Sequence, residues 1–499
     1  MNRKKKLVLN TGAALAYQVV TLLCGFILPK FVIPYFGSAV NGLINSVTQF
    51  LTIITLCECG VGAVVQSALY KPLAEQDDTQ ISRVVASSNR FFGMIMRLLA
   101  VYVLVLMAIY PFVVREEFSW LYTASLILIL ALSYVAQYYL FLSYRLLLNA
   151  DQASYVQLSV HAIALIANTV VTVALIILGA SVHVVKLASA MVFFVQPIVI
   201  KFYVDRHYNL NTKIKLTEEP LKQKWNGLAQ HIASVVQSNA TTVVLTLFST
   251  LQNVSVYSVY YLVVHGIRQI IVSLNTGMQA LLGNMLAKGE MEELDKTYSA
   301  VELAFHAVVT LLFGITGILL LPFVRVYAAN FTDANYIQPV FGVLITLAQA
   351  CYCIRIPYEM MIKAAGHYKQ TQASSFLEAI LNIVVCVVLV WNFGLVGVAI
   401  GTVVAMDYRT VYLVFYLSRN ILQRNISHFL KHILVDGICI ALMVAATWFI
   451  KLQAVNYFAW AWMAVQVGLI CLVICVAINW IFYRNMFAGV IKLFRCRRR

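Results

Sequence analysis

The chain has 499 residues, of which 62% are hydrophobic and only 11% are charged, and its formal net charge is +16. Soluble globular domains carry about 25% charged residues, so this composition excludes a soluble protein and predicts an all-α polytopic membrane protein. The positive charge does not indicate a nucleic-acid partner, because the basic residues gather in short loops between apolar segments, as the positive-inside rule expects.

Hydropathy predicts about fourteen transmembrane helices, since a membrane helix needs about 20 consecutive apolar residues. They are expected at residues 10–34, 40–68, 91–114, 120–146, 153–178, 182–204, 225–248, 254–286, 299–324, 338–363, 371–391, 395–417, 432–450 and 459–483. The basic N-terminus, Met1 to Lys6, resembles the start of a signal peptide. The apolar run that follows continues past Lys30 without a small-residue cleavage site, so it is interpreted as a span.

The distribution of basic residues orients these spans. If the N-terminus is cytoplasmic, the outward loops contain Arg115, Arg325 and Lys451, whereas most of the 36 Lys and Arg lie in cytoplasmic segments. This asymmetry predicts that both termini are cytoplasmic. Every outward loop is short, which leaves little room for an external catalytic site.

The ten cysteines lie in apolar spans, with the exception of Cys496 in the basic tail. Their spacing indicates neither a disulfide framework nor a metal site. We therefore expect no metal and no cofactor.

Weak internal matches recur at a near-constant shift. Tyr144 aligns with Tyr358, Asn168 aligns with Asn382 at the same shift, and Asn10 aligns with Asn226 at nearly that shift. We predict two six-helix bundles related by a parallel repeat, followed by two further helices. The predicted boundaries are 1–207 for the first bundle, 208–224 for a cytoplasmic linker, 225–421 for the second bundle, and 422–499 for the two extra helices and the basic tail.

One predicted helix, Val254 to Leu286, carries a polar stripe. Its members are Tyr257, Tyr261, His265, Arg268, Asn275 and Gln279, whose spacings confine them to an arc of roughly 80°. An arginine near the middle of a span costs about 2.5–3.5 kcal/mol on insertion scales, so this face must contact protein or water. We interpret it as the lining of an aqueous cavity in which Arg268 meets an anion. The alternative is a structural arginine bonded to helix carbonyls or to a buried carboxylate.

Polar residues on other spans predict the same cavity. Span 40–68 places Asn41, Asn45, Gln49 and Thr52 on one face, and span 225–248 similarly places Gln230, Ser234, Gln237 and Thr241. Lys30 either reaches the membrane interface or faces the cavity. Arg355 lies deep in its span, and Pro357 beside it predicts a kink.

Other ionisable residues inside spans have simpler interpretations. Glu58 is expected to pair with a basic residue, with binding of a coupling ion as the alternative. His161 and His306 are expected to be core histidines with hydrogen-bond partners. Glu378 and Asp436 are expected nearer span ends, where water reaches them.

The segment after the second span reads SALYKPLAEQDD, from Ser67 to Asp78, and it follows Glu58-Cys59-Gly60-Val61-Gly62. These residues resemble the corresponding region of bacterial polysaccharide flippases of the multidrug/oligosaccharidyl-lipid/polysaccharide exporter superfamily. The loop itself is predicted to be structural, with Pro72 ending the second span.

The resemblance implies two six-helix bundles around a V-shaped cavity. It also implies transport of undecaprenyl-pyrophosphate-linked oligosaccharides across the bacterial cytoplasmic membrane for capsule, exopolysaccharide or O-antigen synthesis. Arg268 occupies a place comparable to the cationic residue of helix eight in the related lipid II flippases, whereas their helix-one arginine has no clear match and Lys30 lies further along. The partners implied are the lipid-linked oligosaccharide, membrane lipids and polysaccharide polymerase machinery.

The chemistry of such a substrate fits the residues. A guanidinium binds phosphate with two parallel hydrogen bonds, so Arg268 is expected to hold the pyrophosphate. Tyr257 and Tyr261 are expected to contact the glycan, and Gln49 and Gln237 its hydroxyl groups.

Three alternatives remain. A multidrug (MATE-type) exporter would favour an acidic cavity for organic cations. A major-facilitator-type antiporter would carry a glycine-aspartate-arginine pattern in the loop that reads YKPLAEQDD here. A membrane enzyme would need catalytic residues in outward loops, and we expect this protein not to be an enzyme. The sequence identifies neither the glycan nor the driving force.

Overall fold

The computed structural model describes the chain except residues 1–2, 53–55, 137–141, 212–238, 274 and 496–499. The described part is helical, because in a membrane the backbone must satisfy its own hydrogen bonds. Contacts divide the chain into two compact units, Met1–Asn239 and Ala240–Arg499. The predicted domain boundaries stay predictions, since the predicted linker runs into the undescribed residues 212–238.

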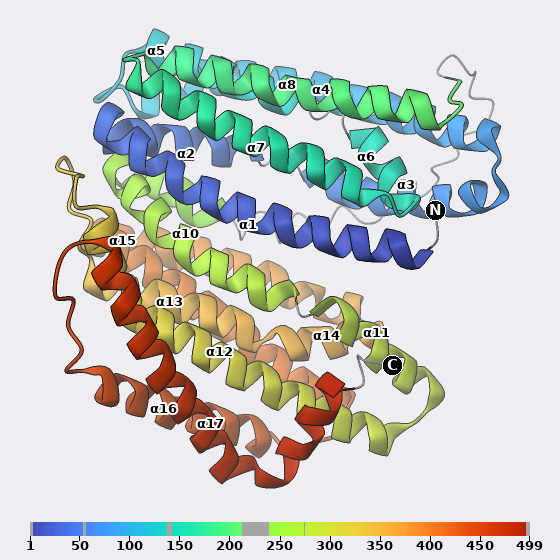
Figure 1. Ribbon diagram of the computed structural model, residues 1–499, viewed down its shortest axis with the longest axis vertical. Helices are drawn as coiled ribbons and strands as arrows, with labels where there is room; N and C mark the ends of the chain where they lie inside the picture. Colours follow the sequence, from blue (N-terminus) through green and yellow to red (C-terminus); the bar gives the residue numbers. More distant parts are fainter. Residues whose placement is uncertain (1–2, 53–55, 137–141, 212–238, 274, 496–499) are drawn as a thin grey trace. The chain divides into compact units, whose positions relative to one another are not determined.

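The first unit is a bundle of long and short helices (Figure 1). In chain order it contains α1 (Arg3–Phe36), α2 (Ser38–Thr52), α3 (Leu56–Glu75), α4 (Asp78–Val113), α5 (Trp120–Ala136), α6 (Leu142–Ala150), α7 (Ser154–Ile177) and α8 (Val182–His207). Helices α1 and α7 pack along each other, as do α7 with α8 and α4 with α5.

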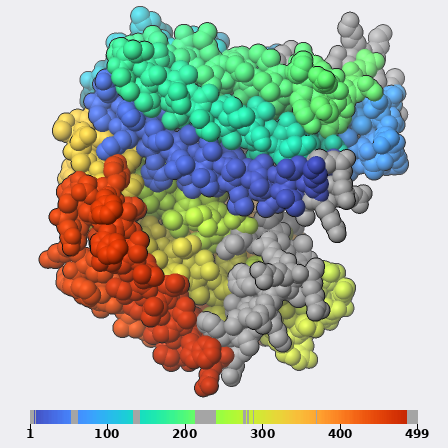
Figure 2. Space-filling view, in the orientation of Figure 1, coloured from blue at the N-terminus to red at the C-terminus, as the bar shows by residue number. Residues whose placement is uncertain are grey.

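The second unit repeats this layout and adds two helices (Figure 1). It contains a short helix over Asn239–Phe248, then α10 (Leu251–Ser273), α11 (Asn275–Lys288), α12 (Met291–Tyr327), α13 (Pro339–Ile354), α14 (Ile356–Ala364), α15 (Tyr368–Asn420), α16 (Ser427–Thr447) and α17 (Tyr457–Arg495). Helix α15 is two helices joined at Gly394, which has non-helical backbone angles. The C-terminal pair, α16 and α17, packs on α12 and forms one side of this unit (Figure 2).

Helix bounds in the two units correspond closely. Helices α6 and α14 have nine residues each, and α14 begins 214 residues after α6. Left-handed backbone angles recur at the same shift: Gln76, Gln152 and Gly179 have positive φ, as do Gly289, Gly366 and Gly394, which lie 213, 214 and 215 residues later. Residues with positive φ commonly end helices, so the two units end equivalent helices in the same way.

Many helix faces carry exposed apolar side chains, as lipid contact requires. On α4, Leu104, Ile109 and Phe112 are 64%, 61% and 65% exposed. Within the described residues, nine helices are long and apolar enough to cross a membrane. The all-α polytopic fold is therefore confirmed, while the exact number of fourteen spans stays a prediction.

The first unit is braced where the start of α1 meets the turn between α6 and α7. Lys6 Nζ lies 3.0 Å from Asp151 Oδ1, and Tyr208 Oη donates a 2.7 Å hydrogen bond to Asp151 Oδ2. Burial, together with this hydrogen bond, raises the pKa of Tyr208 above its ordinary value. The carboxylate of Asp151 thus connects the turn between α6 and α7 with the start of α1 and with the end of α8.

Two sequence expectations about helix ends have different outcomes. Pro72 was expected to end the second span, which is wrong: α3 continues to Glu75, because a proline removes one backbone donor without forcing a helix to stop. The break predicted beside Pro357 is confirmed, since α13 ends at Ile354 and α14 begins at Ile356.

Candidate functional site

The predicted polar stripe is divided between two helices: its members up to Arg268 lie on α10, whereas Asn275 and Gln279 lie on α11. On α10 the rings of its aromatic members stack on one another. The ring centroids of Tyr257 and Tyr261 are 5.5 Å apart, and those of Tyr261 and His265 are 5.1 Å apart. Gln269 Nε2 lies 3.1 Å from His265 Nε2. Tyr257 is only 9% exposed, so this end of the stripe contacts protein, while Tyr261 and His265 are half-buried. The spacing argument therefore placed these residues on one face correctly.

Arg268 continues the stripe and lies against α13. Its guanidinium carbon is 3.8 Å from the ring centroid of Tyr352, and its Nη1 donates a 3.2 Å hydrogen bond to Gln349 Oε1. Its Nε is buried and has no hydrogen-bond partner among the described residues. No described carboxylate pairs with Arg268, so its positive charge is held by an aromatic ring and a neutral amide.

Arg355 lies over the same tyrosine but has a different environment. Its guanidinium carbon is 4.3 Å from the Tyr352 ring centroid, and its Nη1 donates to Glu378 Oε1. Glu378 is 2% exposed and also faces Arg409, whose Nε lies 3.9 Å from Oε2. Arg409 in turn donates a 2.8 Å hydrogen bond to the carbonyl oxygen of Thr371. Glu378 was expected near water; this is wrong, because α15 carries it into the core beside two arginines.

The described carboxylates near Tyr352 pair with cations other than Arg268. Glu378 faces Arg355 and Arg409, and Glu359 pairs with Lys363 at 2.8 Å. The described contacts of Arg268 are a ring and an amide. An arrangement of this kind can bind an anionic group, since a guanidinium held by a ring and an amide keeps donors for phosphate.

Other predicted site residues lie elsewhere. Lys30 is on α1 and Asn45 and Gln49 are on α2, all in the first unit, where Asn45 Nδ2 donates to the carbonyl oxygen of Asn41 at 2.9 Å. Gln237 lies outside the described residues. Glu58 is in α3 and Asn275 begins α11, and their side chains are likewise outside the described part. The roles of these residues stay predictions.

Sequence reasoning missed Gln349 and Tyr352. They precede Arg355 at intervals of three residues, so all three lie on one face of a continuous helical pattern. The same spacing argument that singled out α10 would have found them.

The second unit contains a second buried polar cluster, away from this stripe. Asp436 is 8% exposed, and its Oδ2 forms a 2.6 Å hydrogen bond with Nδ1 of His306, which is 1% exposed. Asp436 was expected near water, which is wrong because α16 packs it against α12. The expectation that His306 is a core histidine with partners is confirmed.

The helical layout defines the fold class of the protein: it is a multi-pass membrane protein with the fold of transporters of the MOP superfamily. A structure described as "Lipid II flippase MurJ, inward closed conformation" superposes with a TM-score of 0.70 and 14% sequence identity, covering 96% of this chain and 100% of that chain. A multidrug resistance MATE family transporter of the MOP superfamily in an inward-facing conformation gives a TM-score of 0.61 at 14% identity, covering 81% of this chain and 95% of that one.

A third similar structure is the eukaryotic MATE transporter AtDTX14, with a TM-score of 0.55 at 13% identity, covering 86% of this chain and 98% of that chain. No protein-family model matches the sequence, and no curated protein matches it. At such low identities the likeness shows a shared fold, and the substrate has to be argued from the residues.

Proposed function

We propose that this protein is a flippase that moves undecaprenyl-pyrophosphate-linked oligosaccharides across the bacterial cytoplasmic membrane, with both termini cytoplasmic. The observation that carries the proposal is Arg268, a cation on α10, which is predicted to lie in the membrane, and its described partners are an aromatic ring and an amide. An intramembrane charge without a described counter-ion supports an anionic ligand.

The residues beside Arg268 suit the remainder of such a substrate. The stacked rings of Tyr257, Tyr261 and His265 form an apolar ladder with polar edges, and aromatic rings with polar edges bind sugars. In this proposal Arg268 binds the pyrophosphate, the half-buried rings of Tyr261 and His265 contact the glycan with Tyr257 stacked behind them, and alternating access carries the headgroup across. Arg355, Lys30, Asn45, Gln49, Asn275 and Gln237 are proposed as further contacts, and Glu58 as a coupling-ion site.

The fold supports a multidrug (MATE-type) exporter equally well, because structures of both kinds superpose on this chain. The local charge favours the flippase. Organic cations would be repelled by Arg268, whereas a pyrophosphate would be attracted to it.

The test uses purified protein in liposomes with a fluorescent undecaprenyl-pyrophosphate oligosaccharide, and it measures the headgroup exposed on each side. Arg268→Ala is expected to lower transport at least tenfold, because hydrogen bonds to charged groups contribute about 1.5–3 kcal/mol each. Arg268→Lys keeps the positive charge but cannot form the two parallel hydrogen bonds of a guanidinium. Its transport rate should therefore lie between those of wild type and Arg268→Ala. Arg419→Ala, which removes an exposed arginine of the same unit, is the matched control and should transport normally.

Two results would contradict the proposal. Normal transport by a stably folded Arg268→Ala protein would remove the anion site. Transport of a cationic dye such as ethidium, with no movement of the lipid-linked sugar, would favour the exporter. Orientation is tested separately by reporter fusions, which should lie outside after Ser119 and after Gln252 and inside after Asn211.

A further inference from the structure

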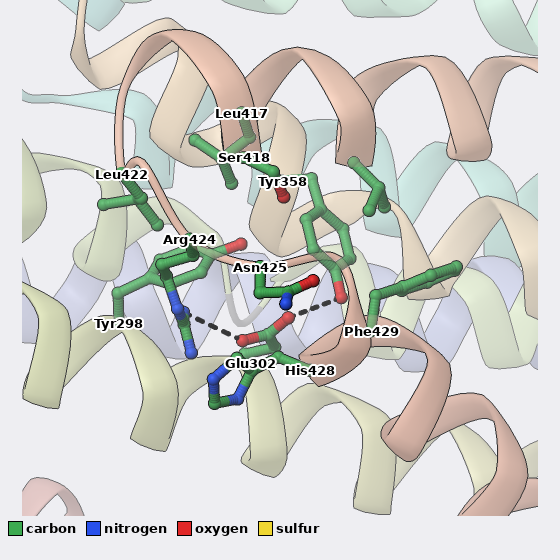
Figure 3. Close-up of a pocket in the computed structure, with 11 residues that line it drawn as sticks. Tyr298, Glu302, Tyr358, Leu417, Ser418, Leu422, Arg424, Asn425, His428 and Phe429 are labelled. Atoms are coloured by element: carbon green, nitrogen blue, oxygen red, sulfur yellow. Dashed lines mark hydrogen bonds and ion pairs between the residues drawn. The ribbon is translucent and has the colours of Figure 1, made fainter.

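A chain of buried polar groups joins α12, α14 and α16 in the second unit. Asp436 Oδ2 lies 2.6 Å from His306 Nδ1, His306 Nε2 lies 3.2 Å from Tyr358 Oη, and Tyr358 Oη lies 2.6 Å from Glu302 Oε1. All four residues are at most 8% exposed. Figure 3 shows the end of this chain, where Tyr358 and Arg424 both contact Glu302.

The three hydrogen bonds among these four side chains need three hydrogen atoms. A neutral imidazole supplies one and the phenol of Tyr358 supplies another, while ionised carboxylates supply none. The geometry therefore requires one additional proton, carried either as a protonated His306 or as a protonated carboxyl group at Asp436 or Glu302.

Charge balance leads to the same number. Asp436 and Glu302 are two buried acids, and Arg424 Nη1, 3.3 Å from Glu302 Oε2, is the guanidinium that pairs with this chain. Arg424 also pairs with Asp295, which is half exposed, at 3.4 Å. One bound proton makes the buried set of Asp436, His306, Glu302 and Arg424 neutral, and neutrality is strongly favoured away from water.

The groups facing this chain come from every element packed on it. They are Asp295 and Tyr298 on α12, Arg424 in the loop after α15, His428, Lys431, His432 and Cys439 on α16, and Cys475 and Tyr483 on α17. The ring of His432 stacks on His306 with centroids 4.7 Å apart. On α14, Glu359 is directed to Lys363 instead.

A small cavity reaches the Glu302 end of the chain. Its volume is about 20 Å³, which is enough for roughly one water molecule. Tyr298 lines it, and the hydroxyl of this residue, which is 1% exposed, has no hydrogen-bond partner among the described residues. The exposed residues Asn425 and His428 also line the cavity, so a water here would connect Glu302 with the surface.

We propose that Asp436, His306, Tyr358 and Glu302 form a proton-binding site that fastens the C-terminal helix pair to the bundle when it is occupied. Loss of the proton removes one of the three hydrogen bonds and leaves an unpaired negative charge, so α16 is held less tightly on α12 and α14. The site does not depend on which substrate the protein moves.

The experiment measures the melting temperature of the purified full-length protein in detergent from pH 5.5 to 9. The folded wild type holds a proton that the unfolded chain, with a neutral imidazole and ionised acids, does not hold at high pH, so its stability should decrease as pH rises. Asp436→Asn removes one buried negative charge and places an amide donor beside His306 Nδ1. A neutral His306 and the phenol of Tyr358 then complete the three hydrogen bonds, and Glu302 and Arg424 balance each other. The extra proton is no longer needed, so this pH dependence should largely disappear.

A potentiometric titration should show wild type releasing one more proton per molecule than Asp436→Asn. His207→Gln, at an exposed histidine of α8, is the control and should retain the wild-type profile. An unchanged pH profile and proton count in Asp436→Asn would overturn the proposal, as would a stabilisation by sodium at high pH equal to that by protons. No transported substrate enters these measurements, so they are independent of the flippase assay.

Discussion

Arg268 and Arg355 lie over the same tyrosine ring, yet their surroundings differ in one respect. Arg355 donates to a buried carboxylate, Glu378, whereas Arg268 donates to the neutral amide of Gln349. Removing one partner of a buried ion pair leaves an uncompensated charge, while removing Arg268 leaves only an amide and a ring. Arg355 is thus part of a buried ion pair that stabilises α13–α15, whereas Arg268 has no described carboxylate partner and is the residue proposed to bind the anion.

The largest effect that sharpens this comparison is expected from Arg355→Leu. It leaves Glu378 buried beside Arg409 alone, which should lower the free energy of unfolding by about 3–5 kcal/mol. Thermal unfolding in detergent measures this loss. Arg268→Leu should remain within about 1 kcal/mol of wild type. Equal losses for the two single arginine variants would show that Arg268 is also structural.

Gln349→Glu tests the comparison from the opposite direction by giving Arg268 a carboxylate of its own. The new anion should compete with the substrate phosphate, so transport in the liposome assay should fall about tenfold while the protein stays folded. Gln349→Met, which has a similar size and no charge, is the control and should retain more transport than Gln349→Glu. The reverse order would mean that the amide itself binds the substrate.

The smallest effect on transport and stability is expected at Asp77 and Asp78, which lie far from Arg268 and Arg355 in the sequence. Asp77 caps α4 by accepting hydrogen bonds from the backbone N–H groups of Thr79 and Gln80, each at 3.0 Å. Asparagine caps helices about as well, so Asp77→Asn combined with Asp78→Asn should leave transport and melting temperature near wild type. Complete loss of transport at a normal protein level would instead assign this loop a gating role.

The sequence alone predicted which residues share one helix face and how far the two repeats are shifted. Spacing alone placed Tyr257, Tyr261, His265 and Arg268 on one face, and weak matches such as Tyr144 with Tyr358 gave the shift that the helix bounds confirm. Local periodicity carries this information directly.

Pairings between distant helices could not be predicted. Glu378 and Asp436 were assigned to water because each lies near the end of a hydrophobic run, whereas the fold buries them beside Arg355 and His306. Such partners are separated by 23 and 130 residues along the chain, and periodicity within one helix gives no information about which helix lies next to it.

The correspondence of helix bounds has a consequence for how a duplicated scaffold diverges. Helix α4 begins at Asp78 and α12 at Met291, so the positions equivalent to Glu302 and His306 in the first half are Asn89 and Gly93. Neither side chain can exchange a proton at physiological pH. The same backbone plan thus carries ionisable side chains at these two positions in one half and none in the other, so the two halves share an architecture but differ in the chemistry at this place.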